Sequence, residues 1–261
     1  SVETYTLIRE LPDDFLTNYQ AKIYNSAAFA QLDFKPFQII KVSLGGRYDR
    51  MAFTYQNFLD QTSGNRSYAQ FTPKIGVTAD LGRDRGLYAN FSKGFSPPGL
   101  SAIFRKNTMA KTGGDLFYYN LKPAVFINME MGGWAALIKN KIYLDWAFYR
   151  MNGSNELLNI RMPDGSTDYQ SAGKTLHKGI EYSITYKPDN QWLLRFGGSN
   201  AIHRFVEFTL SNRQTDVLKN VNGYDMPQAP KWVANTEVTY KPAFAKGLRL
   251  GIEWQAISAW Y

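Results

Sequence analysis

One stretch decides the fold: residues 141–151 read KIYLDWAFYRM. Apolar and polar side chains alternate along it with a period of two. An extended chain would place on one face Ile142, Leu144, Trp146 and Phe148, and on the other Tyr143, Asp145, Ala147 and Tyr149. A helix repeats every 3.6 residues and would mix these sets, so the pattern predicts a β-strand with one apolar face.

The same alternation recurs along most of the chain. It predicts about ten strands, near residues 20–34, 37–56, 67–81, 86–95, 124–138, 141–152, 168–187, 191–207, 230–242 and 247–260. A strand that crosses a membrane needs roughly 9–11 residues, and most of these stretches reach that length.

The connections between these strands alternate between short and long. The short ones lie near residues 35–36, 81–85, 139–140, 188–190 and 242–246, and the long ones near 57–66, 96–123, 153–167 and 208–229. Short turns at one end and long loops at the other are typical of outer-membrane barrels, whose long loops lie outside the cell.

Three short turns share an aromatic residue, a lysine and a proline: Phe34-Lys35-Pro36, Tyr186-Lys187-Pro188 and Tyr240-Lys241-Pro242. Proline donates no hydrogen bond to a sheet and ends strand pairing. Aromatic rings prefer the depth of the lipid headgroups, and lysine prefers the water beside them. These turns are either ordinary hairpin ends or the membrane edge of a barrel.

The width of the predicted sheet indicates which face is wet. Side chains can fill the interior of a closed barrel only when it has about eight strands or fewer. A wider barrel has a wet lumen and needs lipid against its apolar face. Hydrophobic residues make up 44% of the chain and aromatic residues 15%, a composition that also fits a soluble β protein such as a β-sandwich. The fold class is predicted to be all-β, an antiparallel transmembrane β-barrel, here about ten strands of a larger barrel.

Composition argues against several kinds of site. The chain has no cysteine and two histidines, so a structural zinc site is not expected, and no cofactor is predicted. Its net charge of +8 comes from scattered lysines and arginines, which does not indicate nucleic-acid binding. Asp145 and Glu181 fit wall positions on neighbouring strands, and Arg47 and Asp49 should pair within the wall. No nucleophile–base arrangement stands out, so an enzyme is not expected.

Several segments together resemble the barrel of TonB-dependent receptors, most closely the ferric-citrate and siderophore receptors. The matching segments cover most of residues 20–260: Gly46–Asp49, Pro73–Val77, Leu87–Leu100 with its Gly-Phe-x-x-Pro-Pro turn, Leu121–Pro123 with Glu130 and Gly132, Gly173-Lys174 with Lys178–Glu181, and Pro227 with Pro230. The resemblance implies a receptor in the bacterial outer membrane that imports ferric siderophores, with outer-membrane lipid around it and energy from the TonB complex.

The sequence also departs from this family. No plug domain or TonB box is recognisable, and the family's barrel has about 22 strands. Residues 1–261 are therefore expected to be a fragment of the barrel domain, with the plug and the closing strands absent. Such a fragment would leave open sheet edges. The alternative function is a passive porin-like or structural outer-membrane barrel, and a plug region upstream in the parent gene would distinguish the two.

The long loop at 96–123 is the predicted ligand site. It carries cations and aromatic residues: Phe104, Arg105, Lys106, Lys111, Phe117, Tyr118 and Tyr119. Arginine and lysine bind carboxylate or phenolate oxygens through charge-assisted hydrogen bonds, and aromatic rings cover apolar faces. The predicted ligand is a ferric siderophore or another anionic metal chelate. A solvated loop that contacts nothing is the alternative.

Overall fold

The computed structural model describes residue 15 and residues 17–106, 116–117, 120–138, 141–165 and 167–260. These residues form ten strands and one short helix, in the order β1 (Tyr19–Phe37), β2 (Ile40–Asn57), β3 (Ser63–Asp80), β4 (Arg85–Ser96), α1 (Leu100–Ile103), β5 (Ala124–Leu137), β6 (Ile142–Arg161), β7 (Thr167–Tyr186), β8 (Trp192–Glu207), β9 (Trp232–Tyr240) and β10 (Leu250–Ile257). The ten predicted strands are confirmed; the sequence did not predict α1.

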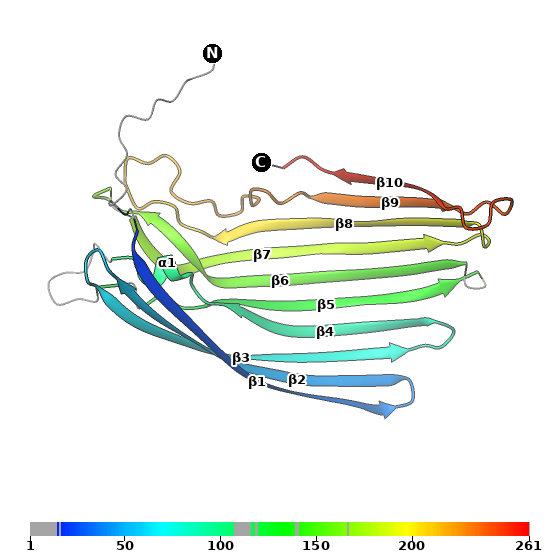
Figure 1. Ribbon diagram of the computed structural model, residues 1–261, viewed down its shortest axis with the longest axis horizontal. Helices are drawn as coiled ribbons and strands as arrows, with labels where there is room; N and C mark the ends of the chain where they lie inside the picture. Colours follow the sequence, from blue (N-terminus) through cyan, green and yellow to red (C-terminus); the bar gives the residue numbers. More distant parts are fainter. Residues whose placement is uncertain are drawn as a thin grey trace, which may run out of the picture.

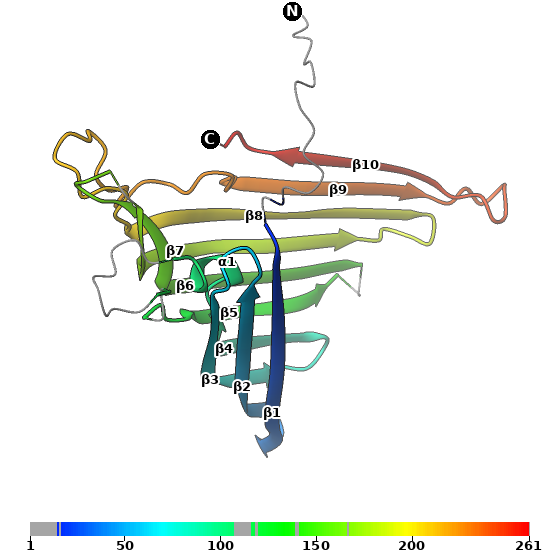
Figure 2. The same cartoon turned by 60° about the vertical axis from the view of Figure 1, so that its left-hand side comes forward.

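All ten strands belong to one sheet, in sequence order from β1 to β10 (Figure 1). Each strand pairs antiparallel with its neighbours in the chain, as the alternation predicted. The sheet is a curved wall, because β1–β3 run in a different direction from β8–β10 (Figure 2). Within the described residues β1 and β10 are the two edges, and the wall does not close on itself.

The two ends of the wall differ as predicted. Every turn from an odd-numbered strand to the next even-numbered one lies at the right-hand end of Figure 1, and α1 lies near the other end. We call these the short-turn end and the long-loop end. All three aromatic-lysine-proline turns lie at the short-turn end. There the Trp192 ring stacks on Tyr240 with 4.4 Å between ring centroids, an arrangement suited to a membrane edge.

Two predicted long loops are wrong. Residues 63–66, which the sequence assigned to a loop, pair with residues 53–56 and extend the β2–β3 hairpin. Likewise β6 and β7 run on to Arg161 and from Thr167, so residues 162–166 connect them. A bulge between Gly153 and Glu156 interrupts the alternation, and Asn155 within it has a φ of 56°. The residues of this bulge are types that are common in turns, and for that reason the sequence predicted a loop where the strand continues.

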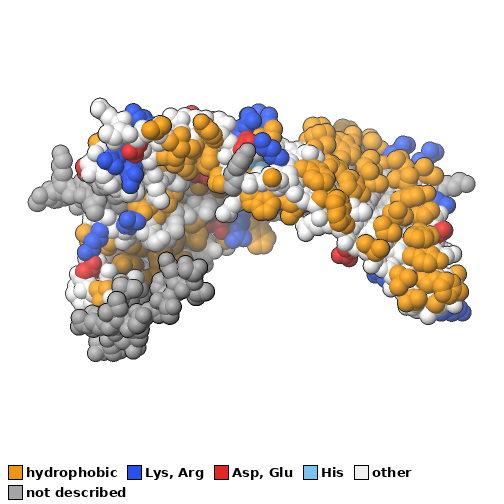
Figure 3. Space-filling view, turned by 90° about the horizontal axis from the view of Figure 1, so that it is seen from above, with side chains coloured by type: hydrophobic (Ala, Val, Ile, Leu, Met, Phe, Trp, Pro, Cys, Tyr) orange, Lys and Arg blue, Asp and Glu red, His pale blue; other side chains and the backbone are white. Residues whose placement is uncertain are grey.

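The register separates a polar face from an apolar face. Trp146 lies opposite Tyr182 and Leu144 opposite Ile184, whereas Asp145 lies opposite Ser183 on the other face. The predicted assignment of residues 142–149 to two faces is confirmed. Figure 3 shows hydrophobic side chains gathered over the half that ends in short turns. No described helix has the length and apolarity needed to cross a membrane.

Two contacts on the polar face, one between charged side chains and one between a glycine and an indole ring, hold neighbouring parts of the wall. The Arg47 guanidinium lies 2.8 Å from the Asp49 carboxylate, so this predicted ion pair is confirmed. At Gly86 the ring of Trp134, on the neighbouring strand, occupies the space of a side chain. A Cβ atom there would lie 2.4 Å from a ring carbon of Trp134, so only glycine fits beside this indole.

Candidate functional site

The loop between β4 and β5 folds back against the polar face at the long-loop end. Helix α1 begins this loop and buries Ile103 completely. Ile103 and Phe104 pack with Phe53 of β2 and Tyr68 of β3 in one apolar cluster. Figure 2 shows α1 on the side toward which the sheet curves. The loop therefore covers part of the wall at this end.

Phe104 and Phe117 attach the loop to β2. The Phe104 ring stacks on Tyr55 with a centroid distance of 4.9 Å and an interplanar angle of 8°. Phe117 meets the same tyrosine edge-on at 6.0 Å. Their exposed fractions are 5% and 1%. These two predicted ligand-contact residues are thus part of the packing that holds the loop in place.

A second attachment joins the loop to β7. Ala102 and Leu121 pack with Tyr169 in another buried cluster. The hydroxyl of Ser171 donates to the Lys122 carbonyl at 3.0 Å and accepts from the Lys122 amide at 2.8 Å. Because β2 and β7 are not neighbours in the sheet, the loop bridges the polar face between them.

Arg105 lies at the β7 side of this bridge. Its guanidinium carbon is 4.9 Å from the centroid of the Tyr169 ring. The guanidinium also donates a hydrogen bond to the Tyr169 hydroxyl. Arg105 remains exposed as a residue, so its charge faces water while the ring fixes its direction. An oriented, exposed guanidinium is suited to bind an anion.

Lys106 lies at the β2–β3 side. Its ammonium is 2.6 Å from the Asp60 carboxylate in the loop that joins these strands, and 54% of its side chain is exposed. Hydrogen bonds from Lys106 and Thr62 lower the pKa of Asp60 to about 2. Asp60 is therefore ionised at neutral pH and offsets part of the Lys106 charge.

The structure brings together four of the seven predicted site residues: Phe104, Arg105, Lys106 and Phe117. The other three, Lys111, Tyr118 and Tyr119, lie outside the described residues. Sequence reasoning missed Tyr169 and Asp60. The sequence did not indicate Tyr169 because it belongs to a predicted strand. Its contact with Arg105 forms only when the loop folds back onto that strand.

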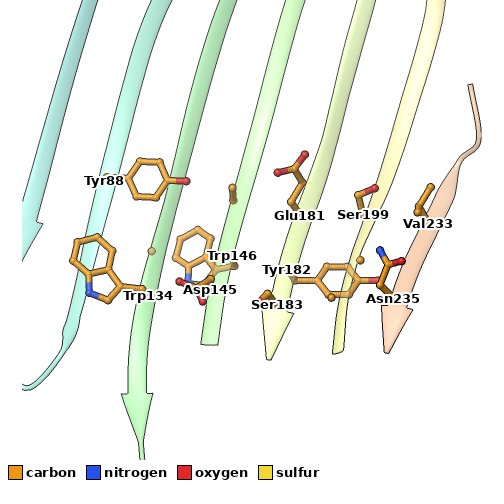
Figure 4. A pocket seen from close by; sticks show the side chains of 14 residues that line it. Tyr88, Trp134, Asp145, Trp146, Glu181, Tyr182, Ser183, Ser199, Val233 and Asn235 are labelled. Atoms are coloured by element: carbon orange, nitrogen blue, oxygen red, sulfur yellow. The ribbon is translucent and has the colours of Figure 1, made fainter. Parts of the chain in front are cut away.

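A groove lies on the polar face toward the short-turn end, with a volume of about 530 Å³. Figure 4 shows its polar side chains on five strands: Tyr88, Asp145, Glu181, Ser199 and Asn235. Two of these are carboxylates. Beside it, Glu237 is paired with Arg195 at 3.1 Å and Arg249 at 3.0 Å. The groove is a polar, locally acidic part of the wall.

The two histidines meet on neighbouring strands. Nδ1 of His177 lies 2.7 Å from Nδ1 of His203, and Nε2 of His177 lies 3.1 Å from the Thr175 hydroxyl. That hydroxyl donates to the Glu156 carboxylate. An ionised Glu156 can only accept, so Thr175 accepts from Nε2–H of His177, and in a neutral His177 the Nδ1 atom then accepts from Nδ1–H of His203. Over the described part of the chain, no group of three or more His, Asp or Glu side chains could hold a metal ion.

Comparison with known proteins identifies the family. Residues 4–261 match the family model described as TonB dependent receptor-like, beta-barrel. One curated relative is the probable TonB-dependent siderophore receptor PiuA of Acinetobacter baumannii, 24% identical over 208 residues. That match covers 77% of this chain and 27% of the relative.

Solved structures share the fold. The crystal structure of PiuA from Acinetobacter baumannii superposes with a TM-score of 0.69 at 19% identity, covering 85% of this chain and 32% of that one. The ferric-catecholate import receptor Fiu of Escherichia coli K12 gives a TM-score of 0.68 at 16% identity, covering 93% and 36%. The chain thus spans about a third or less of the length of these proteins.

Proposed function

Because this chain belongs to the TonB-dependent receptor family, we propose that it forms part of the wall of an outer-membrane receptor that imports an iron-siderophore or similar anionic ferric chelate. The polar face lines the lumen and the apolar face contacts lipid. The TonB complex supplies the energy through a plug domain. The plug and the remaining strands of the barrel are contributed by residues other than these 261.

The inward-folded loop between β4 and β5 is the observation that carries this proposal. In this loop Arg105 and Lys106 lie at the long-loop end of the polar face, each exposed and each held by the side chain of another segment. Siderophore complexes are commonly anionic and present carboxylate, phenolate or catecholate oxygens, which these cations bind well. Lys111, Tyr118 and Tyr119 belong to the same loop and complete the proposed contact set.

The charge pattern of the polar face supports a binding site at the mouth. Asp145 and Glu181 line the groove nearer the short-turn end. An anionic chelate is repelled by these carboxylates and attracted by the loop cations. It should therefore first bind at the long-loop end.

Uptake by cells tests the proposal. Cells carrying the full-length receptor should accumulate radiolabelled ferric chelates, and a proton uncoupler should abolish this accumulation. The main alternative is a passive porin-like barrel, through which the chelate would equilibrate at the same rate with or without the uncoupler. Absence of accumulation for every ferric chelate tried would reject the function.

A further inference from the structure

Two cations face one another on the apolar face. Arg150 of β6 and Lys178 of β7 are direct partners in the register, and both are exposed. Phe148 and Ile180 form the next pair on the same face, toward the short-turn end. Within the described residues neither cation takes part in an ion pair, and the Arg150 guanidinium reaches only Asn152, at 3.4 Å.

This pair carries an electrostatic cost. Like charges directly opposite one another on neighbouring strands repel. The carboxylates of the surrounding strands do not relieve the repulsion, because Asp145 and Glu181 occupy register positions on the opposite face. An anion bound between Arg150 and Lys178 would remove the repulsion.

The height of the pair corresponds to one border of the apolar band. Arg150 follows Ile142 by eight residues on the same face, which is roughly 27 Å along a strand at about 3.4 Å per residue. A strand tilt of about 35–45° reduces this to roughly 20 Å, close to the ~25 Å height of the lipid-facing band. The two cations therefore lie where acyl chains end and headgroups begin, on the long-loop side.

A groove with an apolar floor leads to these cations. It has a volume of about 550 Å³, with Phe148, Ile180 and Ile202 along it and Arg150, Lys178 and Lys231 at its edge. A second groove, of about 370 Å³, runs on the other side of Phe148 past Met129 and Met131, and also reaches Arg150. Figure 3 shows lysine and arginine side chains bordering the hydrophobic area on its long-loop side.

The acid that faces Lys231, at the edge of the larger groove, is already paired. Asp225 lies 2.6 Å from Lys231 and 3.1 Å from Arg204. Hydrogen bonds from these two cations lower the pKa of Asp225, so it carries its charge at neutral pH. Arg204 and Lys231 thus share this one carboxylate. Arg150 and Lys178 have no ion-pair partner within the described residues, so the surface keeps a positive excess.

We propose that Arg150 and Lys178 bind the phosphate group of an anionic lipid in the membrane leaflet on the long-loop side, with its acyl chains in the two grooves beside Phe148. The apolar grooves require an amphiphile, and the cations require an anionic headgroup. This inference rests on the membrane placement of the apolar face and does not depend on which chelate the receptor imports.

Lipid retention by the purified full-length receptor tests the proposal. The receptor is placed in phosphatidylcholine bilayers that contain either phosphorylated lipid A or its dephosphorylated form, and the lipid retained per receptor is measured by native mass spectrometry. The receptor should prefer the phosphorylated form. Arg150→Gln with Lys178→Gln should reduce this preference roughly tenfold or more. Equal retention of the two lipids by the unaltered receptor would overturn the proposal.

The matched control is Lys35→Gln with Lys246→Gln, which removes the same charge at the short-turn end. This control variant should keep the preference for the phosphorylated lipid. If it lost as much of that preference as the Arg150/Lys178 variant, net charge alone would explain the effect and the proposed site would be overturned. Arg150→Lys should retain most of the preference. Chelate binding should be normal in the Arg150/Lys178 variant, so failure of the lipid site is distinguishable from failure of the proposed transport function.

Discussion

The guanidinium of Arg105 lies over the ring of Tyr169, with 4.9 Å from its central carbon to the ring centroid, and donates a hydrogen bond to the Tyr169 hydroxyl. These residues are 64 positions apart in the sequence. Their contact joins the loop after β4 to β7 and sets the direction of a cation at the long-loop end of the polar face. The function proposed above depends on that orientation.

Removing the ring should loosen the loop locally. Tyr169→Ala eliminates the stacking and hydrogen bond to Arg105, worth about 1–3 kcal/mol together, and opens the cluster with Ala102 and Leu121. Amide exchange at residues 100–106 should accelerate while the strands stay protected. Tyr48→Ala removes an exposed ring from β2 and should leave this exchange unchanged. Equal exchange in the two variants would show that Tyr169 does not hold the loop.

Buried Phe117 should stabilise the loop more than its exposed neighbour Leu116 does. Phe117→Ala removes a side chain that is 1% exposed and should cost about 3–5 kcal/mol of local stability. Leu116→Ala is the matched control, because Leu116 is 46% exposed and next in the chain. Limited proteolysis should cut the loop readily only in the Phe117 variant. Similar protection in both variants would contradict the packing described for the Tyr55 ring.

Acid should release the Lys106 contact only at low pH. The pKa of Asp60 is lowered from its ordinary value of 3.8 to about 2. The ion pair therefore stabilises the loop fully at pH values above 3.8, and this stabilisation is lost as the pH falls toward 2. In Lys106→Ala the pKa of Asp60 should rise toward its ordinary value. Carbodiimide labelling of Asp60 across pH, read by mass spectrometry, measures the difference. Identical labelling profiles with and without Lys106 would contradict it.

A glycine pair on β4 tests the wall. At Gly86 a Cβ atom would lie 2.4 Å from the Trp134 ring and 2.7 Å from the Ala79 carbonyl oxygen, whereas at Gly94 no atom lies within 4 Å. Gly86→Ala should therefore destabilise the barrel by about 1–3 kcal/mol, and Gly94→Ala should be nearly neutral. The temperature at which the folded form is lost on gel electrophoresis reports this. Equal temperatures for the two variants would show that the indole moves aside freely.

The strands were predictable because lipid and lumen impose opposite requirements on alternate residues. Ile142, Leu144 and Trp146 alternate with Asp145 strictly enough to fix both strand and face. The alternation did not predict two strand segments correctly. One is the bulge around Asn155, and the other is residues 63–66, whose backbone pairs in the sheet although their side chains are typical of a turn.

The site was only partly predictable, for a different reason. A long loop with cations and aromatic rings was visible in the sequence. Composition alone could not show that Phe104 and Phe117 would turn inward while Arg105 and Lys106 stayed exposed, because that depends on Tyr55 and Tyr169 of distant strands. The four described residues of the predicted set thus divide into two that hold the loop and two that keep exposed charge.

Binding of ferric chelates to the purified full-length receptor tests the central claim most directly. Arg105→Ala with Lys106→Ala removes two cations from the loop, and loss of one charged hydrogen bond costs roughly 1.5–3 kcal/mol, or about ten- to a hundredfold in affinity. The comparison variant, Arg213→Ala with Lys219→Ala, removes the same charge from the loop between β8 and β9. We predict at least about tenfold weaker binding in the first variant, with normal barrel assembly, and near-normal binding in the second. Unchanged affinity in the Arg105/Lys106 variant would remove this loop from the binding site and contradict the account.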